Sequence, residues 1–149
     1  ADTDIAFRAY AMNLGHKHVP EMQQLTGLAV PPLFTPAVIP AHRGMVVEIP
    51  LPLAQIARSA PVDGLRDCLA DFYTGSAVVR VNEEAPAELV LRRSMAPSDR
   101  LELHVFGAKD GSQARLVAVL DNLGKGASGA AVQNLNLMAG LAETAGLQL

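Results

Sequence analysis

Runs of apolar residues, either continuous or alternating with polar ones, predict a series of strands between residues 7 and 120. Alternation places successive side chains on opposite faces of a strand, so Leu101, Leu103 and Val105 are predicted to share one face. The unbroken apolar stretch before Asp121 is typical of a buried strand. Together these patterns predict strands at residues 7–14, 45–53, 76–81, 100–107 and 114–120.

Three further stretches predict helices. Apolar residues at helical spacing indicate an amphipathic helix over residues 61–72, and the segment 128–141 is also compatible with a helix. Pro20 suits a first helical turn, Glu21 suits the positive end of a helix dipole, and Gly27 suits a helix end. A short helix is therefore expected between His16 and Gly27.

The connecting segments decide the fold class. Four prolines between residues 30 and 44 remove backbone donors and favour extended backbone, which predicts an edge or crossover path. Asp110 and Gly111 are a turn signal between two apolar stretches and predict a hairpin. Hairpin-joined strands with intervening helices indicate an α+β fold in which helices cover a mixed, largely antiparallel sheet.

Composition excludes several classes of protein. A chain of 149 residues suits one domain, and a net charge of −3 with scattered basic residues predicts no nucleic-acid partner. No apolar run reaches the roughly 18–20 residues that a bilayer requires, so no membrane partner is expected. The single cysteine fits a reducing cytosol, and a cytoplasmic location is predicted. The sequence begins without methionine, which predicts a processed or truncated start.

Gly124, Gly126 and Gly129 have the G-x-G-x-x-G spacing of dinucleotide-binding loops. Such a loop needs a strand before it, a helix after it and then a second parallel strand that carries an acid for the ribose. Only 20 residues follow Gly129, so a βαβ unit is not expected to close. The glycines are therefore predicted not to form a pyrophosphate cradle.

The densest cluster of reactive side chains is His16, Lys17, His18 and Glu21. Two histidines on one face of an extended chain could bind a metal, with Glu21 as a third ligand, but no fourth ligand stands at a recognisable spacing. No metal is predicted. An imidazole near a carboxylate could instead act as a general acid or base. Solvated histidines at a helix start are the alternative that spacing leaves open.

Other polar residues have competing interpretations. Arg43 follows the proline-rich segment and could clamp a carboxylate or phosphate, or could lie on the surface before a strand. Lys125 and Ser128 stand at an expected helix start, where free backbone donors attract anions. Cys68 lies beside two aspartates, which disfavour a thiolate, and is interpreted as a core or boundary residue.

Three separated segments carry a resemblance to a known family. The stretches GHKHVPEM, FTPAVIPAHRGM and DNLGKGASGAAVQNLNLMAGL resemble, in this order, the carboxy-terminal half of N-acetyl-γ-glutamyl-phosphate reductase, the NADPH-dependent enzyme of arginine biosynthesis. Ala130 stands where many members carry glutamine, which indicates the shorter form of the enzyme. The implied fold is that of the carboxy-terminal domain of glyceraldehyde-3-phosphate dehydrogenase-like enzymes.

The resemblance implies a substrate-binding and oligomerisation domain over residues 1–149. Its segment 121–149 would return to an NADP-binding domain outside this sequence, and the glycines would approach the nicotinamide end of the cofactor. NADP is expected in the full-length parent but not on this chain alone. A homo-oligomer is also implied.

The implied chemistry begins with a thiolate that attacks an acyl phosphate to give a thioester, which hydride from NADPH then reduces to the aldehyde. The family's cysteine motif, Asn-Pro-Gly-Cys, is absent here, and Cys68 matches none of its context. The resemblance assigns the acid/base imidazole to His16, with Glu21 orienting it. His18 and Arg43 would bind substrate, and Lys125, Gly126 and Asn134 would lie on the cofactor side.

Two alternatives remain. The first is a non-catalytic binding or scaffold domain that shares the fold. The second is the corresponding domain of a related semialdehyde dehydrogenase, which would use the same thioester chemistry on a different acyl phosphate. The isolated chain is predicted to be inactive in each case.

Overall fold

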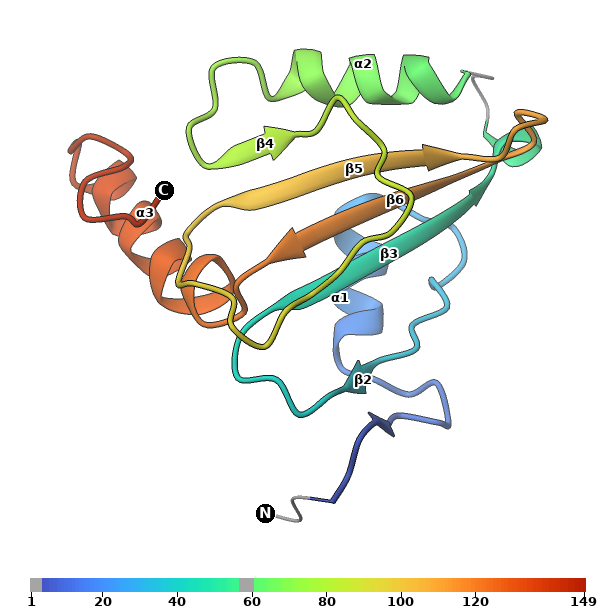
Figure 1. Cartoon of the computed structure of the whole chain (residues 1–149), viewed down its shortest axis with the longest axis horizontal. Coiled ribbons are helices and arrows are strands. Elements are labelled where there is room, and N and C mark those ends of the chain that lie inside the picture. Colours follow the sequence, from blue (N-terminus) through green and yellow to red (C-terminus); the bar gives the residue numbers. More distant parts are fainter. Residues whose placement is uncertain (1–3, 57–60) are drawn as a thin grey trace. The chain divides into compact units, whose positions relative to one another are not determined.

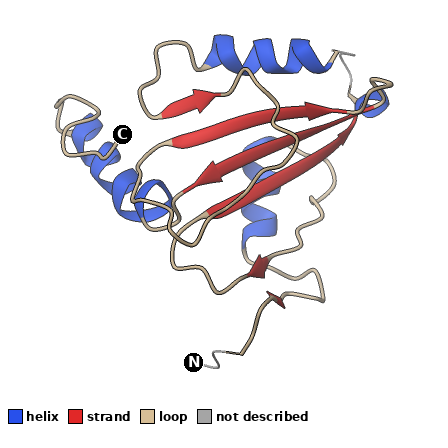
Figure 2. Ribbon diagram, viewed as in Figure 1, coloured by secondary structure: helices blue, strands red, loops and turns tan. Residues whose placement is uncertain are grey.

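The apolar stretches between residues 45 and 120 form a four-stranded mixed sheet, seen in the computed structural model in Figures 1 and 2. The structure describes residues 4–56 and 61–149. The chain divides into two compact units, Ala1–Ala41 and His42–Leu149. The sheet belongs to the second unit. Its strands are β3 Met45–Pro52, β4 Val79–Val81, β5 Leu101–Gly107 and β6 Gln113–Leu120.

The strand order β3-β6-β5-β4 confirms the predicted mixed, largely antiparallel sheet. β6 pairs antiparallel with both β3 and β5, whereas β4 pairs parallel with β5. A tight turn joins β5 to β6, as predicted, and Gly111 adopts the left-handed backbone (φ 70°) that this turn requires. The connection from β4 to β5 runs across the sheet in Figure 1, and Leu91 on it packs against Gly44.

One sheet face is apolar throughout. The registers place Val105 of β5 beside Leu116 of β6, and Leu116 beside Ile49 of β3, so alternate residues of three strands share this face. The helix α2 Val62–Phe72, one residue shorter than predicted, packs on β4 and β5, and a Cβ at Gly107 would collide with its Val62 side chain. The core therefore gathers near β5 and β6, with these buried residues: Leu53, Val78, Val105, Ala114, Val117 and Leu120.

The apolar face continues beyond α2 onto β3, where its side chains are exposed. Met45, Val47 and Ile49 have 40%, 41% and 51% of their surface accessible. β3 is an edge strand, and its Pro50 and Pro52 lack the backbone donors that an added strand would pair with. This part of the molecule thus offers an open apolar face together with a protected edge.

Short elements complete the second unit. The 3-10 turn η1 Leu53–Gln55 follows β3, and the π-helical turn η2 Gly124–Ser128 follows β6. η2 leads directly into the helix α3 Gly129–Met138, which lies within the predicted 128–141 stretch and ends three residues earlier.

In the first unit, the helix α1 His18–Thr26 confirms the predicted short helix, and Gly27 ends it in the left-handed conformation (φ 68°). The predicted strand 7–14 was wrong in length, because only β1 Arg8–Ala9 forms, paired antiparallel with β2 Ala37–Val38. Left-handed backbone at Ala11 and Leu14 (φ 53° and 61°) ends the extended run. The predicted processed or truncated start concerns Ala1 to Thr3, which lie outside the described residues.

Candidate functional site

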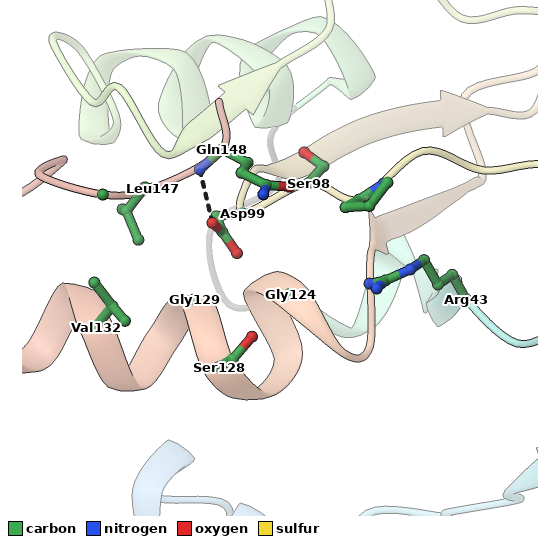
Figure 3. Close-up of a pocket in the computed structure, with 11 residues that line it drawn as sticks. Arg43, Ser98, Asp99, Gly124, Ser128, Gly129, Val132, Leu147 and Gln148 are labelled. Atoms are coloured by element: carbon green, nitrogen blue, oxygen red, sulfur yellow. Dashed lines mark hydrogen bonds between the residues drawn. The ribbon is translucent and has the colours of Figure 1, made fainter.

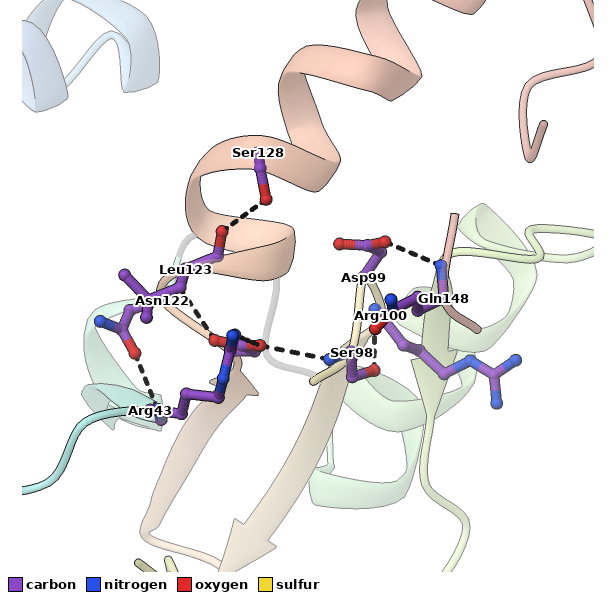
Figure 4. Close-up of polar contacts among 10 residues, drawn as sticks. Arg43, Ser98, Asp99, Arg100, Asn122, Leu123, Ser128 and Gln148 are labelled. Atoms are coloured by element: carbon purple, nitrogen blue, oxygen red, sulfur yellow. Dashed lines mark hydrogen bonds and ion pairs between the residues drawn. The ribbon is translucent and has the colours of Figure 1, made fainter. Parts of the chain in front are cut away.

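A fully buried carboxylate stands directly after β6. Asp121 has no exposed surface, and its oxygens accept hydrogen bonds from the Arg43 guanidinium (Nη1, 2.6 Å), the Ser98 N–H (3.2 Å) and the Leu123 N–H (2.9 Å), as Figure 4 shows in part. Burial alone would raise the pKa of Asp121, but the N–H groups of Leu123, Ser98 and Gly124 and the Arg43 guanidinium together lower it below its usual value. Asp121 is therefore held as an anion.

The neighbouring residue Asn122 reinforces this junction. Its Oδ1 accepts a hydrogen bond from the Gly44 N–H at 2.7 Å, while Asp121 holds Arg43 one residue earlier. Two consecutive side chains after β6 therefore fix the segment that enters β3. Arg43, predicted as a substrate clamp, is in this structure an ion-pair partner whose side chain remains 26% exposed.

The glycines after β6 have a packing role. A Cβ at Gly124 would collide with the Ser98 carbonyl oxygen, and a Cβ at Gly129 would collide with the Asp99 carboxylate. At Gly126 the nearest neighbours would lie 3.4 Å away, and the residue is exposed. Gly124 and Gly129 therefore allow η2 and α3 to pass close to residues 98 and 99, and no βαβ unit follows the glycines among the described residues.

A cavity of about 250 Å³ lies beside this junction, between η2, the start of α3 and the carboxy-terminal segment (Figure 3). Arg43 lies at one end, and the Asp99 side chain points toward the helix that carries Gly129. Asp99 pairs with Gln148 twice, since its N–H donates to the Gln148 carbonyl (2.7 Å) and its Oδ2 accepts from the Gln148 N–H (2.8 Å). The carboxy-terminal segment therefore closes one wall.

The residues predicted to face the cofactor are spread along η2 and α3. The Lys125 ammonium donates to Gln133 Oε1 at 2.6 Å, and Gln133 in turn donates to Glu143 at 2.7 Å. Asn134 is exposed and its side chain has no hydrogen bond in the part of the chain that the structure describes. The buried amide on this helix is Asn136, which donates to the Glu143 and Ala145 carbonyls and holds the chain after α3.

The predicted catalytic residues belong to the first unit. The His18 N–H donates to His16 Nδ1 (3.2 Å), so neutral His16 carries its proton on Nε2. The His16 ring lies 4.7 Å from that of His18 and 5.0 Å from that of Phe34, measured between centroids. The Glu21 side chain has no polar partner among the described residues. It therefore makes no hydrogen bond or ion pair with His16 in this structure.

Two further predictions concern metal and thiol chemistry. Within residues 4–56 and 61–149, no group of three or more histidine, cysteine or acidic side chains is placed to hold a metal ion. Cys68 was interpreted as a core or boundary residue, and this was wrong because its position on α2 is exposed.

No helix among the described residues is long and apolar enough to cross a membrane.

Sequence reasoning missed Asp121, Ser98 and Asp99. Asp121 could have been flagged, because an acid directly after the apolar run Leu116 to Leu120 either leaves the core or must be hydrogen-bonded inside it. Ser98 and Asp99 had no such signal. Their role depends on α3 folding back against the loop before β5, a contact between segments more than 20 residues apart in the sequence.

This fold belongs to a known class of domain. Residues 1–122 match the family described as semialdehyde dehydrogenase, dimerisation domain, and the chain is a member of that family. The match covers the first unit and the second unit as far as Asn122.

Three similar curated relatives share one enzyme name. The chain is 43% identical to N-acetyl-gamma-glutamyl-phosphate reductase 2 of Nostoc sp. over 153 aligned residues, which cover 99% of this chain and 48% of that protein. It is 45% identical to the N-acetyl-gamma-glutamyl-phosphate reductase of Rhizobium meliloti over 87% of this chain and 43% of that protein, and 44% identical to that of Brucella ovis over 88% and 43%. The chain thus spans about half the length of the curated relatives it matches.

Proposed function

We propose that this chain is the substrate-side, self-associating half of an N-acetyl-γ-glutamyl-phosphate reductase of arginine biosynthesis. The observation that carries the proposal is the 43% identity to a reductase of this name over 99% of the chain. That similarity spans the histidine cluster, the Arg43 segment and the glycine turn, which are the three segments that support the assignment independently of one another.

The nucleotide is assigned to the other half of the parent protein. In this chain Gly124 and Gly129 pack closely against residues 98 and 99. The Lys125 ammonium donates a hydrogen bond to Gln133. The turn therefore does not fit a pyrophosphate cradle. Lys125, Gly126 and Asn134 remain predicted neighbours of an NADP that another domain would hold.

His16 is the proposed acid/base residue of this half. Its Nδ1 is occupied by a backbone donor, so Nε2 is the nitrogen that can give or accept a proton. A thioester that accepts hydride develops negative charge on its oxygen, and an imidazole N–H at that oxygen would stabilise it and protonate it. The nucleophilic cysteine would come from outside this sequence. Glu21 has no contact with His16 here, and its orienting role stays a prediction.

Substrate binding is proposed for His18 and Arg43. Both present N–H donors, which suit the carboxylate and phosphate groups of an acylated amino-acid phosphate. The Arg43 side chain is 26% exposed and lines the cavity of the second unit, while Asp121 engages its Nη1. An anionic substrate would pair with the remaining donors.

Self-association is proposed for the exposed apolar face of β3. Met45, Val47 and Ile49 would lie against the same face of a second copy, since burial of contiguous apolar surface favours association. Pro50 and Pro52 argue against an edge-to-edge assembly. A face-to-face arrangement of two sheets is therefore the proposed dimer.

The segment 121–149 is proposed to contact the NADP-binding domain. α3 and the residues after it expose apolar side chains that this chain leaves uncovered, with Leu135, Met138 and Leu141 at 62%, 87% and 58% exposure. Another domain of the same protein would bury them. A cytoplasmic location also stays a prediction.

The direct test is the activity of the full-length protein from the same gene. NADPH oxidation would be followed with N-acetyl-γ-glutamyl phosphate and, separately, with β-aspartyl phosphate. The proposal expects the first substrate to be strongly preferred in kcat/KM. Preference for the second would assign a related semialdehyde dehydrogenase, and inactivity on both would favour the non-catalytic scaffold domain.

A further inference from the structure

We propose that Asp121 is a positioning residue for the substrate clamp, because it holds the Arg43 guanidinium at the cavity and links it to the turn η2. The inference rests on the proposed function, in which Arg43 binds the acyl phosphate. Asp121 itself touches no substrate, since it has no exposed surface. It acts through Arg43.

The geometry of the ion pair leaves the clamp available. One guanidinium nitrogen, Nη1, contacts Asp121 Oδ2 at 2.6 Å, and the Arg43 side chain retains 26% exposure on the cavity wall. A bidentate pair would have used two nitrogens and turned the fork away from any second anion. The observed pair fixes the direction of the guanidinium and keeps donors for another partner.

Asp121 does not depend on Arg43 alone to be satisfied. The backbone N–H groups of Ser98 and Leu123 also donate to its carboxylate, so the buried charge keeps partners when Arg43 engages a second anion. Arg43, by contrast, has no other hydrogen-bond partner in the described part of the chain. The ion pair therefore fixes the position of the Arg43 side chain, whereas the buried Asp121 carboxylate keeps other hydrogen-bond donors without it.

The same residue also holds the start of the glycine turn. The Asp121 carbonyl accepts the Gly126 N–H (2.9 Å), and its carboxylate accepts the Leu123 N–H. One residue thus connects the segment before β3, the loop before β5 and η2, as Figure 4 shows for the side chains around it. A long, flexible arginine side chain is ordered before substrate arrives, which removes part of the entropic cost of binding.

The first test is a double-mutant cycle in the full-length enzyme. Asp121→Asn should raise the KM for the acyl phosphate about tenfold or more and change kcat less than about threefold, because the clamp is lost while the reacting groups remain. Arg43→Ala should do the same. In the double variant the KM should match that of Arg43→Ala, since Asp121 has then nothing left to position.

Gly107→Ala is the matched control for general destabilisation. Its Cβ would collide with Val62 at the far end of β5, so it should lower the melting temperature without moving KM. Asp121→Ser, which keeps a hydroxyl acceptor, replaces Asp121→Asn if the latter does not fold. An unchanged KM in the Asp121 variants, or effects that add in the double variant, would overturn the inference.

A second readout separates this inference from the proposed function. In the 149-residue chain, the Arg43 Nη1–H group that donates to Asp121 should give an NMR signal protected from solvent exchange, and Asp121→Asn should broaden or shift it toward that of a free arginine. An unaltered Arg43 signal would contradict the positioning role even in an active enzyme. A wild-type enzyme inactive on acyl phosphates, with the signal lost as expected, would instead contradict the proposed function.

Discussion

At the scale of single residues, the buried Asp121 makes stability depend on pH. Its folded-state pKa lies below the ordinary value near 3.9, so its contribution to stability is present above about pH 4 and is lost as the pH falls through the folded pKa. The melting temperature of Asp121→Asn should lie below that of the wild-type chain at pH 7, and this difference should shrink as the pH falls below about 4. A difference that stays constant down to pH 3 would contradict the account.

A second prediction at this scale concerns His16. In the full-length enzyme, His16→Asn should lower kcat by about a hundredfold or more while the affinity for NADPH stays nearly unchanged, because a general acid/base typically contributes 10² to 10⁴. Stopped-flow turnover and nucleotide titration measure the two quantities separately. Lys17→Gln, one residue away and exposed, is the control and should retain activity. Normal turnover of the His16 variant would remove this residue from the mechanism.

At the scale of elements, the glycine turn carries the clearest test of packing. Gly129→Ala should destabilise the chain by about 1–3 kcal/mol, because its new methyl group would collide with the Asp99 carboxylate. Gly126→Ala is the matched control, since its methyl group would meet nothing closer than 3.4 Å. Urea unfolding of both variants compares them. Equal stabilities would show that the close approach of α3 to residue 99 is not required.

Most of the longer helices and strands could be predicted from the sequence, whereas the strand expected at 7–14 was wrong in length. Helical periodicity identified α2, and continuous or alternating apolar runs identified β3, β5 and β6, because these elements are built largely from apolar side chains in a regular pattern. The expected strand 7–14 failed because the left-handed residues Ala11 and Leu14 are neither glycine nor asparagine, so nothing in the pattern marks the break.

For the site, the sequence singled out Arg43 and the glycines but not what they contact. Asp121, Ser98 and Asp99 become their neighbours only after β6, η2 and the loop before β5 have assembled. A contact of this kind has no local period. The resemblance to reductases suggested which residues take part in the chemistry. The packing role of Gly124 and Gly129 became visible only in the three-dimensional structure.

At the scale of the whole molecule, the isolated chain should not be a nucleotide-binding protein. Gly124 and Gly129 pack closely against Ser98 and Asp99, and no parallel strand follows the glycine turn among the residues that the structure describes. Titrating NADPH into the purified chain while following its fluorescence should therefore show no saturation in the micromolar range. Saturable binding at micromolar concentration would mean that this half carries a cradle of its own.

This half of the protein is proposed to carry the surface through which the protein self-associates. The mass of the purified 149-residue chain, measured by light scattering at several concentrations, tests it most directly. The expected mass is that of a dimer or larger oligomer. Val47→Glu, on the exposed apolar face, should give a folded monomer, whereas Glu48→Lys, which points to the opposite face of β3, should leave the oligomer intact. A wild-type chain that is monomeric at all concentrations, or an oligomer that survives Val47→Glu, would contradict the claim.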